Sequence, residues 1–280
     1  MSAVEVRGLR KRYGNLEALR GIDFTIEAGE VFGLLGPNGA GKTTTVEILE
    51  GYRQWDEGTV SVLGADPQHA GRDWREQVGV VLQSSSLYPT LTVRESLAVF
   101  AGYYRGPRDP GEVIEIVGLT DKRDARVRTL SGGQKRRLDL GLALVGDPEL
   151  IFLDEPTTGF DPGARRSAWE TIRNLRSLGK TILLTTHYLD EAEQLADRVA
   201  VLRDGVIVRE GTPAQLTGGA AVETEIRYRR GDETVVEHTA EPTRRLHELT
   251  EAALADGGEL EGLEVRRPTL EDVYLELTAE

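Results

Sequence analysis

The sequence predicts an α/β protein with a mostly parallel sheet, followed by a small α+β domain. Apolar runs of strand length, such as residues 31–35 and 151–153, alternate with segments of helical periodicity. Such alternation indicates a parallel sheet covered by helices on both faces. After residues 211–213 the pattern changes to a glycine-rich linker and a mixed set of short elements. We therefore expect a main domain over residues 1–217 and an accessory domain over residues 218–280.

The elements of the main domain are predicted from periodicity and turn signals. Alternation over residues 22–26 is typical of a half-buried strand. Thr92 and Glu95 have the spacing of a capping box, which predicts an amphipathic helix that extends to about Tyr104. The same reasoning predicts further strands at 31–35, 78–82, 150–153 and 181–185, and further helices at 43–49, 132–144 and 162–178.

The accessory domain is predicted from shorter patterns. Strands are expected at 222–228, 234–239 and 263–266, with a helix at 244–255. Thr269 and Asp272 are expected to cap a last helix. A unit of about 60 residues is near the smallest size that folds by itself.

Composition excludes several classes of protein. The chain has 280 residues, of which 39% are hydrophobic and 29% charged, and no cysteine, so disulfides are excluded. No apolar stretch approaches the roughly 20 residues of a membrane helix, and the first residues lack the apolar core of a secretory signal. The net charge is −13, and residues 221–280 hold 16 acidic and 7 basic residues. This acidity disfavours nucleic-acid binding, and it predicts that any membrane attachment runs through another protein.

A glycine-rich loop between a predicted strand and a predicted helix is typical of a phosphate-binding site. Glycines let successive backbone N–H groups point at phosphate oxygens, and the helix N-terminus adds partial positive charge. We expect Lys42 to contact the β- and γ-phosphates and the Thr43 hydroxyl to bind Mg²⁺. The residues predicted to bind nucleotide here are Gly36, Pro37, Asn38, Gly39, Ala40, Gly41, Lys42, Thr43 and Thr44.

Two carboxylates follow the apolar run at residues 150–153. Ligands bind at the carboxyl ends of the strands in an open parallel sheet, so Asp154 and Glu155 should lie near the phosphate loop. We expect Asp154 to hold Mg²⁺ through water. Glu155, one residue later, is placed to orient or deprotonate the attacking water.

A second candidate anion site lies at residues 130–134, Leu-Ser-Gly-Gly-Gln. Ser131, Gly132, Gly133 and Gln134 open a predicted helix, where free N–H groups can face an anion. Because the chain already has one phosphate loop, a second such site implies a second nucleotide or a second subunit.

On these motifs, residues 3–217 resemble the ATP-binding-cassette (ABC) ATPases. The resemblance implies a P-loop NTPase cassette with an antiparallel β subdomain and a helical subdomain at about 84–145. It also implies ATP and Mg²⁺ as ligands, and two cassettes bound head-to-tail around two ATP molecules. Ser131 to Gln134 then complete the partner's ATP site. By the same resemblance, the remaining roles are adenine stacking for Tyr13, Mg²⁺ and γ-phosphate contact for Gln83, coupling across the dimer for Asp161, and γ-phosphate contact for His187.

The resemblance also suggests what the ATPase drives. Residues 267–275 are similar to the ending of the drug- and polyketide-export group, the daunorubicin-resistance-like subunits, whose membrane channel is a separate polypeptide. A transmembrane partner is expected to contact about Gln83–Tyr104, which places the protein peripherally at the cytoplasmic face of a membrane. The cassette partner can be an identical or a different chain.

Two other functions stay open on the sequence alone. One is an importer ATPase subunit. The other is a soluble cassette ATPase that acts on ribosomes or DNA, which the single cassette and the acidic tail disfavour. The 130–134 motif is inconsistent with a kinase or a GTPase.

Overall fold

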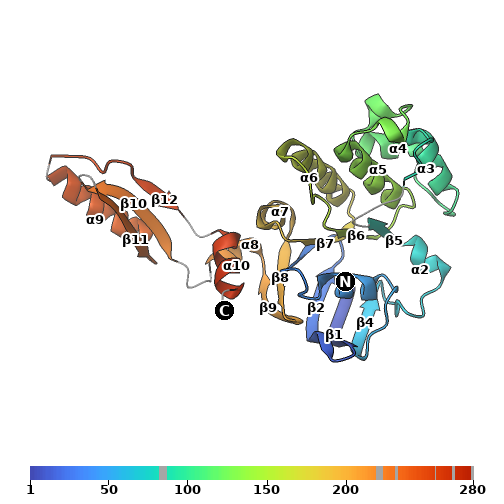
Figure 1. The fold of residues 1–280 in the computed structure, drawn as a ribbon, viewed down its shortest axis with the longest axis horizontal. Coiled ribbons are helices and arrows are strands. Elements are labelled where there is room, and N and C mark those ends of the chain that lie inside the picture. Colours follow the sequence, from blue (N-terminus) through green and yellow to red (C-terminus); the bar gives the residue numbers. More distant parts are fainter. Residues whose placement is uncertain (82–86, 219–222, 231–232, 256, 267–268, 279–280) are drawn as a thin grey trace. The chain divides into compact units, whose positions relative to one another are not determined.

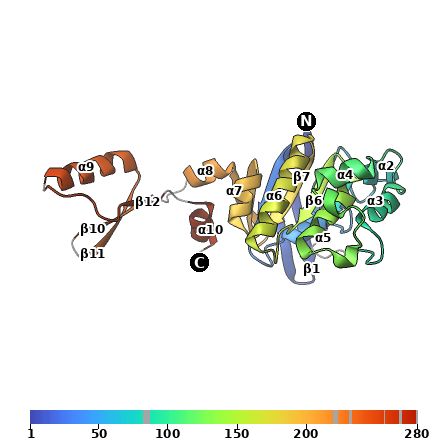
Figure 2. The ribbon, with the colours of Figure 1, turned by 90° about the horizontal axis from the view of Figure 1, so that it is seen from above.

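The computed structural model describes residues 1–81, 87–218, 223–230, 233–255, 257–266 and 269–278 (Figure 1, Figure 2). The chain divides into two compact units, Met1–Thr212 and Pro213–Glu280, and each has its own sheet and core. Within the described residues, no helix combines the length and the hydropathy needed to cross a bilayer.

A six-stranded sheet forms the centre of the first unit. Its strands are β3 (Val31–Leu35), β5 (Val78–Val81), β6 (Leu150–Asp154), β7 (Thr181–Thr186), β8 (Arg198–Arg203) and β9 (Val206–Gly211). They lie in the order β5-β6-β7-β3-β8-β9, and all neighbours are parallel except β8 and β9. Every side chain of β3 and β7 is buried, as expected for strands covered on both faces.

An antiparallel sheet covers part of one face. It consists of β1 (Ser2–Tyr13), β2 (Leu16–Glu27) and β4 (Glu57–Val62), in the order β2-β1-β4. Phe24 of β2 stacks on Phe32 of β3 with ring centroids 5.5 Å apart. The two sheets therefore share one core, to which α1 (Lys42–Leu49) also contributes.

Helices cover the other face. Alternate residues of a strand point to opposite faces, so Ile151 and Leu153 pack with the helices while Leu150 and Phe152 pack with the antiparallel sheet. The remaining helices of this unit are α2 (Arg72–Glu76), α3 (Val93–Ala101), α4 (Pro110–Ile116), α5 (Gly132–Leu144), α6 (Pro162–Ser177) and α7 (Leu189–Leu195), with 3₁₀ turns at Thr120–Lys122 and Val127–Thr129. The predicted fold class is confirmed.

Helix α3 is shorter than predicted. The capping box is present, since the Thr92 hydroxyl accepts from the Glu95 N–H and the Glu95 carboxylate accepts from the Thr92 N–H. The helix nevertheless ends at Ala101 rather than near Tyr104. Past Gly102 the N–H groups of Tyr103 and Tyr104 bond three residues back instead of four, which tightens the chain into a turn.

The second unit is a small α+β fold. It contains α8 (Pro213–Gly218), β10 (Thr224–Arg230), β11 (Glu233–Thr239), α9 (Pro242–Ala255), β12 (Glu264–Arg266) and α10 (Leu270–Thr278). Its antiparallel sheet has the order β11-β10-β12, and Ile226, Tyr228 and Leu249 form its core. Thr269 and Asp272 cap α10 as predicted, whereas sequence patterns do not predict α8.

Candidate functional site

The phosphate loop runs from the end of β3 to the start of α1, and close packing explains its glycines. A Cβ at Gly36 would lie 2.4 Å from the carbonyl oxygen of Leu202 on β8. Gly41 has a φ of +110°, and a Cβ there would lie 2.7 Å from the Ala18 carbonyl oxygen. Strands β2 and β8 thus hold the loop in a conformation that only glycine adopts without strain.

Lys42 is aimed into this loop. Its side chain is 6% exposed, and Nζ donates to the Gly36 carbonyl at 2.7 Å and the Pro37 carbonyl at 3.2 Å. Burial lowers its pKa, while the nearby charges of Glu155 and Asp154 act in the opposite direction. A buried ammonium next to a helix N-terminus and an exposed loop fits an anionic phosphate chain.

The two carboxylates lie at the carboxyl end of β6. Asp154 Oδ1 accepts a hydrogen bond from the Thr185 hydroxyl of β7. Glu155 has a φ of +44°, which is rare for a residue other than glycine and marks backbone strain of the kind found at functional sites. The Glu155 N–H donates to the Thr185 carbonyl and hydroxyl, both at 3.1 Å.

The Glu155 carboxylate has defined neighbours. Oε2 accepts from the Thr158 hydroxyl at 3.0 Å, and His187 Nδ1 lies 3.4 Å from Oε1. The structure thus brings together a carboxylate, a half-exposed imidazole and, through electrostatic coupling, the Lys42 ammonium. This arrangement can hold a water between an acid–base group and a phosphate.

The residues present fit a Mg²⁺ that accompanies a nucleotide. Among the described residues, no three His, Cys, Asp or Glu side chains cluster into a metal site. Nucleotide Mg²⁺ needs no such cluster, because phosphates and waters supply most of its ligands. Thr43 is exposed at the start of α1 and Asp154 ends β6, so one hydroxyl and one carboxylate are available. Gln83 lies outside the described residues.

The 130–134 motif forms a capping box on α5. The Ser131 hydroxyl accepts from the Gln134 N–H, and the Gln134 side chain accepts from the Ser131 N–H. Ser131 and Gly132 are exposed, and a Cβ at Gly132 would meet no atom within 4 Å. A Cβ at Gly133 would lie 3.2 Å from the Ala164 side chain. The helix start therefore presents an open surface at Gly132.

Asp161 caps the next helix, as its position before Pro162 predicts. Oδ1 accepts from the N–H groups of Gly163 and Ala164 at 2.9 and 3.0 Å.

Tyr13, at the end of β1, is 37% exposed. The Lys11 ammonium and the Arg53 guanidinium lie 5.6 and 5.3 Å from its ring centroid, so two cations lie close to the ring.

A buried polar network that the sequence does not predict links these parts. Arg136 of α5 donates to the carbonyl groups of Asp154 and Pro156 at 3.0 Å. Glu191 of α7 is fully buried, and Oε1 accepts from the Thr157 hydroxyl at 2.8 Å and the Trp169 indole at 3.1 Å. Burial raises the Glu191 pKa. The network joins α5, the chain on both sides of Glu155, and α7, the helix after His187.

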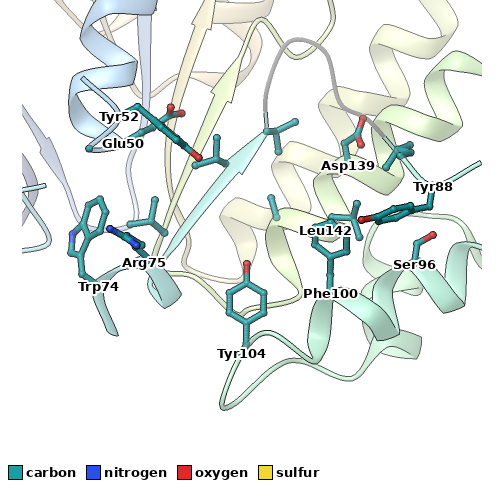
Figure 3. Close-up of a pocket in the computed structure, with 16 residues that line it drawn as sticks. Glu50, Tyr52, Trp74, Arg75, Tyr88, Ser96, Phe100, Tyr104, Asp139 and Leu142 are labelled. Atoms are coloured by element: carbon teal, nitrogen blue, oxygen red, sulfur yellow. The ribbon is translucent and has the colours of Figure 1, made fainter. Parts of the chain in front are cut away.

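A separate cavity of about 740 Å³ lies beside β5 (Figure 3). One wall comes from Leu87, Tyr88, Phe100 and Tyr104, which belong to the segment predicted to contact a membrane partner. The other includes Glu50, the C-cap residue that follows α1. We call this cavity the β5 pocket.

Comparison with known proteins agrees with this geometry. Residues 19–158 match the family model described as "ABC transporter". "Nod factor export ATP-binding protein I" of Rhizobium meliloti is 42% identical over 99% of this chain and 88% of its own. The protein of the same name from Burkholderia lata is 46% identical over 81% of this chain and 74% of its own.

Solved structures show the same fold. One, titled "Structure of ATP binding subunit of ABC transporter", has a TM-score of 0.70 at 25% identity over 99% of both chains. Another is the cassette MJ0796, dimeric and in a post-hydrolysis state with ADP and Pi, with a TM-score of 0.65 at 26% identity over 75% of this chain and 98% of that one. The chain therefore belongs to the ABC transporter family, as a nucleotide-binding, ATP-hydrolysing subunit.

Proposed function

We propose that this subunit pairs head-to-tail with a second cassette around two Mg-ATP and drives export through a separate transmembrane subunit. The observation that carries the proposal is the meeting of Glu155, His187 and Lys42 at one edge of the sheet. Residues 1–217 are proposed as the nucleotide-binding domain and residues 218–280 as an accessory domain; the compact units of the structure divide five residues earlier, after Thr212, because α8 belongs to the second unit.

The chemistry follows from the positions of these side chains. Glu155 orients and deprotonates the attacking water, while Thr158 and His187 hold its carboxylate in place. Lys42 and the loop N–H groups stabilise charge that develops on the γ-phosphate. The Thr43 hydroxyl, with Asp154 and Gln83, would hold Mg²⁺, which would neutralise phosphate charge. His187 also contacts the γ-phosphate.

The second cassette completes the site. Ser131 to Gln134 form the start of α5, where Ser131 and Gly132 are exposed, and they supply donors to the γ-phosphate bound by the other subunit. The adenine stacks on Tyr13, and Asp161 couples the two sites. Because the γ-phosphate touches both subunits, its loss weakens the interface and the dimer opens. The dimeric state of MJ0796 supports this assembly.

Export, rather than import, is supported by the names of the relatives. The relatives from Rhizobium meliloti and Burkholderia lata are both called export ATP-binding proteins. The β5 pocket is the proposed docking surface for the membrane subunit, because its wall is formed by the predicted contact segment. The protein would then lie peripherally at the cytoplasmic face of the membrane, without contact to nucleic acid.

Isolation of the Glu155→Gln variant from membranes with ATP present tests the proposal. We expect a polytopic membrane protein in near-stoichiometric amount, identified by mass spectrometry. Tyr88→Asp in the same background should reduce its recovery about tenfold or more, because it introduces a charge into the docking surface. Leu178→Asp, at an exposed position at the end of α6, is the control and should leave recovery unchanged.

Two results would contradict the proposal. Recovery of ribosomal proteins in place of a membrane protein would indicate a switch on a soluble partner. Recovery of a solute-binding protein with the membrane subunit would indicate an importer.

A further inference from the structure

The β5 pocket contains one acidic side chain that its walls do not balance. Glu50 is the C-cap of α1 and lies on the wall opposite Tyr88 and Phe100 (Figure 3). Among the described residues, no ion pair or hydrogen bond includes its carboxylate. By contrast, Glu47, three residues earlier on the same helix, is paired with Arg53. Glu50 therefore lines the cavity without an ion-pair partner among the described residues.

The charges around Glu50 oppose its ionisation. Burial, with the nearby charges of Asp154 and Glu47, raises the Glu50 pKa to about 8. The other titratable groups that line the pocket are Tyr52, Arg75, Tyr88, Tyr104 and Asp139. Arg75 is exposed on α2 and makes no ion pair with Glu50 among the described residues. A cation added to the pocket would favour the ionised form of Glu50 and so lower its pKa.

The rest of the pocket is suited to a protein segment. Leu87, Phe100 and Leu142 contribute apolar surface, while Tyr52 and Tyr88 are 78% and 55% exposed. Exposed aromatic rings around an apolar hollow are typical of the centre of a protein–protein interface. Tyrosine rings also attract cations, which adds to the attraction of a carboxylate.

We propose that the β5 pocket binds a helical segment of the membrane subunit through one basic side chain, arginine or lysine, whose partner is the Glu50 carboxylate. This inference rests on the proposed function for the existence of that subunit, and adds the chemistry of its docking segment. Charge complementarity selects the occupant: an apolar pocket with one unpaired acid fits an apolar helix face with one cation.

The position of Glu50 also connects docking with ATP binding. Helix α1 begins at Lys42 in the phosphate loop and ends with Glu50 as its cap. The same helix thus contacts the phosphates at its N-terminus and the partner's cation at its C-terminus. A cation held at Glu50 changes the electrostatic environment of Asp154, which already acts on Glu50. Docking and the metal-site carboxylate are therefore linked.

A pH series tests the premise that Glu50 is unpaired. A carboxyl group whose pKa rises from 4.5 to about 8 on folding stabilises the unfolded state progressively between these values. Glu50→Gln should therefore melt at least about 2 °C higher than the parent at pH 8, and at nearly the same temperature as the parent at pH 4.5. An equal melting temperature at pH 8 would mean that Glu50 has a cation partner in the free chain.

The docking segment can be identified by cross-linking, because the chain contains no cysteine. A single Tyr88→Cys change in the full chain gives a unique attachment point inside the pocket. A thiol-directed photoreactive cross-linker, which inserts into any nearby C–H bond and needs no particular side chain, is applied to membranes with ATP, and mass spectrometry then identifies the peptide seated there. We expect a peptide of a polytopic membrane protein with an arginine or lysine within about one helical turn of the contact.

A charge exchange then tests the pair. Glu50→Arg should reduce recovery of the membrane subunit about tenfold or more, and changing the partner's basic residue to glutamate should restore it to within about threefold. Glu170→Arg, at an exposed site on α6, is the matched control and should have no effect. Gel filtration and ATP binding of the Glu50→Arg chain check that the variant folds, so that a failure to rescue is not attributed to misfolding.

The outcomes separate this inference from the proposed function. A membrane peptide without a basic residue, or Glu50→Arg behaving like Glu170→Arg, would overturn the Glu50 pairing and leave the transporter assignment in place. The pairing would also be overturned if the charge exchange did not restore recovery of the membrane subunit. Cross-linking only to a soluble protein would overturn the transporter assignment as well.

Discussion

The Glu155→Gln variant is expected to hydrolyse ATP about 10²–10⁴ times more slowly than the parent, which is the usual contribution of a positioned acid–base group. ATP affinity should stay within about threefold, because Lys42 and the loop glycines remain. Glutamine keeps the size of the side chain and its hydrogen bond from Thr158. It cannot accept the proton of the attacking water. Single-turnover hydrolysis and equilibrium nucleotide binding measure the two effects separately.

Glu149→Gln is the matched control for this prediction. Glu149 is exposed immediately before β6, whereas Glu155 follows the last residue of the same strand. The same Glu→Gln change at the amino end of β6, away from the predicted nucleotide site, should leave turnover unchanged. Equal turnover by Glu155→Gln and the parent would remove Glu155 as the base, and His187 would become the next candidate.

The parts of the fold that follow from local sequence were predicted well. Strand β3 was predicted with its observed bounds, because a run of apolar residues that enters a glycine loop has few other conformations. The caps at Thr92 and Ser131 were also predictable, since a capping box lies within four residues. The end of α3 was not. The glycine at residue 102 is compatible with a helix that continues and with one that ends, so the end of α3 is decided by tertiary packing.

Residues that act through tertiary contacts were missed for a related reason. Glu191 follows His187 by four residues on a short helix and resembles an ordinary surface acid in the sequence. Its burial depends on Thr157 and Trp169, which come from distant segments. Glu50 was missed in the same way, because nothing near it in sequence shows that α3 and α5 close a pocket beside it. Spacing identifies motifs, but it does not show which charges are left without partners.

The surface at Gly132 gives the second large expected effect. Gly132→Val in the Glu155→Gln background should weaken ATP-dependent dimerisation at least about tenfold, or about 1.4 kcal/mol. In the single chain a Cβ at this position meets no atom within 4 Å, and valine costs no more than glycine in a helix. The isolated subunit should therefore fold and bind ATP normally. In a head-to-tail dimer, the valine would occupy the space of the other subunit's γ-phosphate.

Light scattering after gel filtration, with and without ATP, measures this effect. Gly106→Val is the control, because a Cβ there also meets no atom within 4 Å and the residue lies away from the α5 start. It should dimerise like the Glu155→Gln parent. If Gly132→Val dimerised equally well, the start of α5 would not face the partner's nucleotide, and the head-to-tail arrangement would be wrong for this chain. If it lost ATP binding as a single chain, the motif would serve its own site instead.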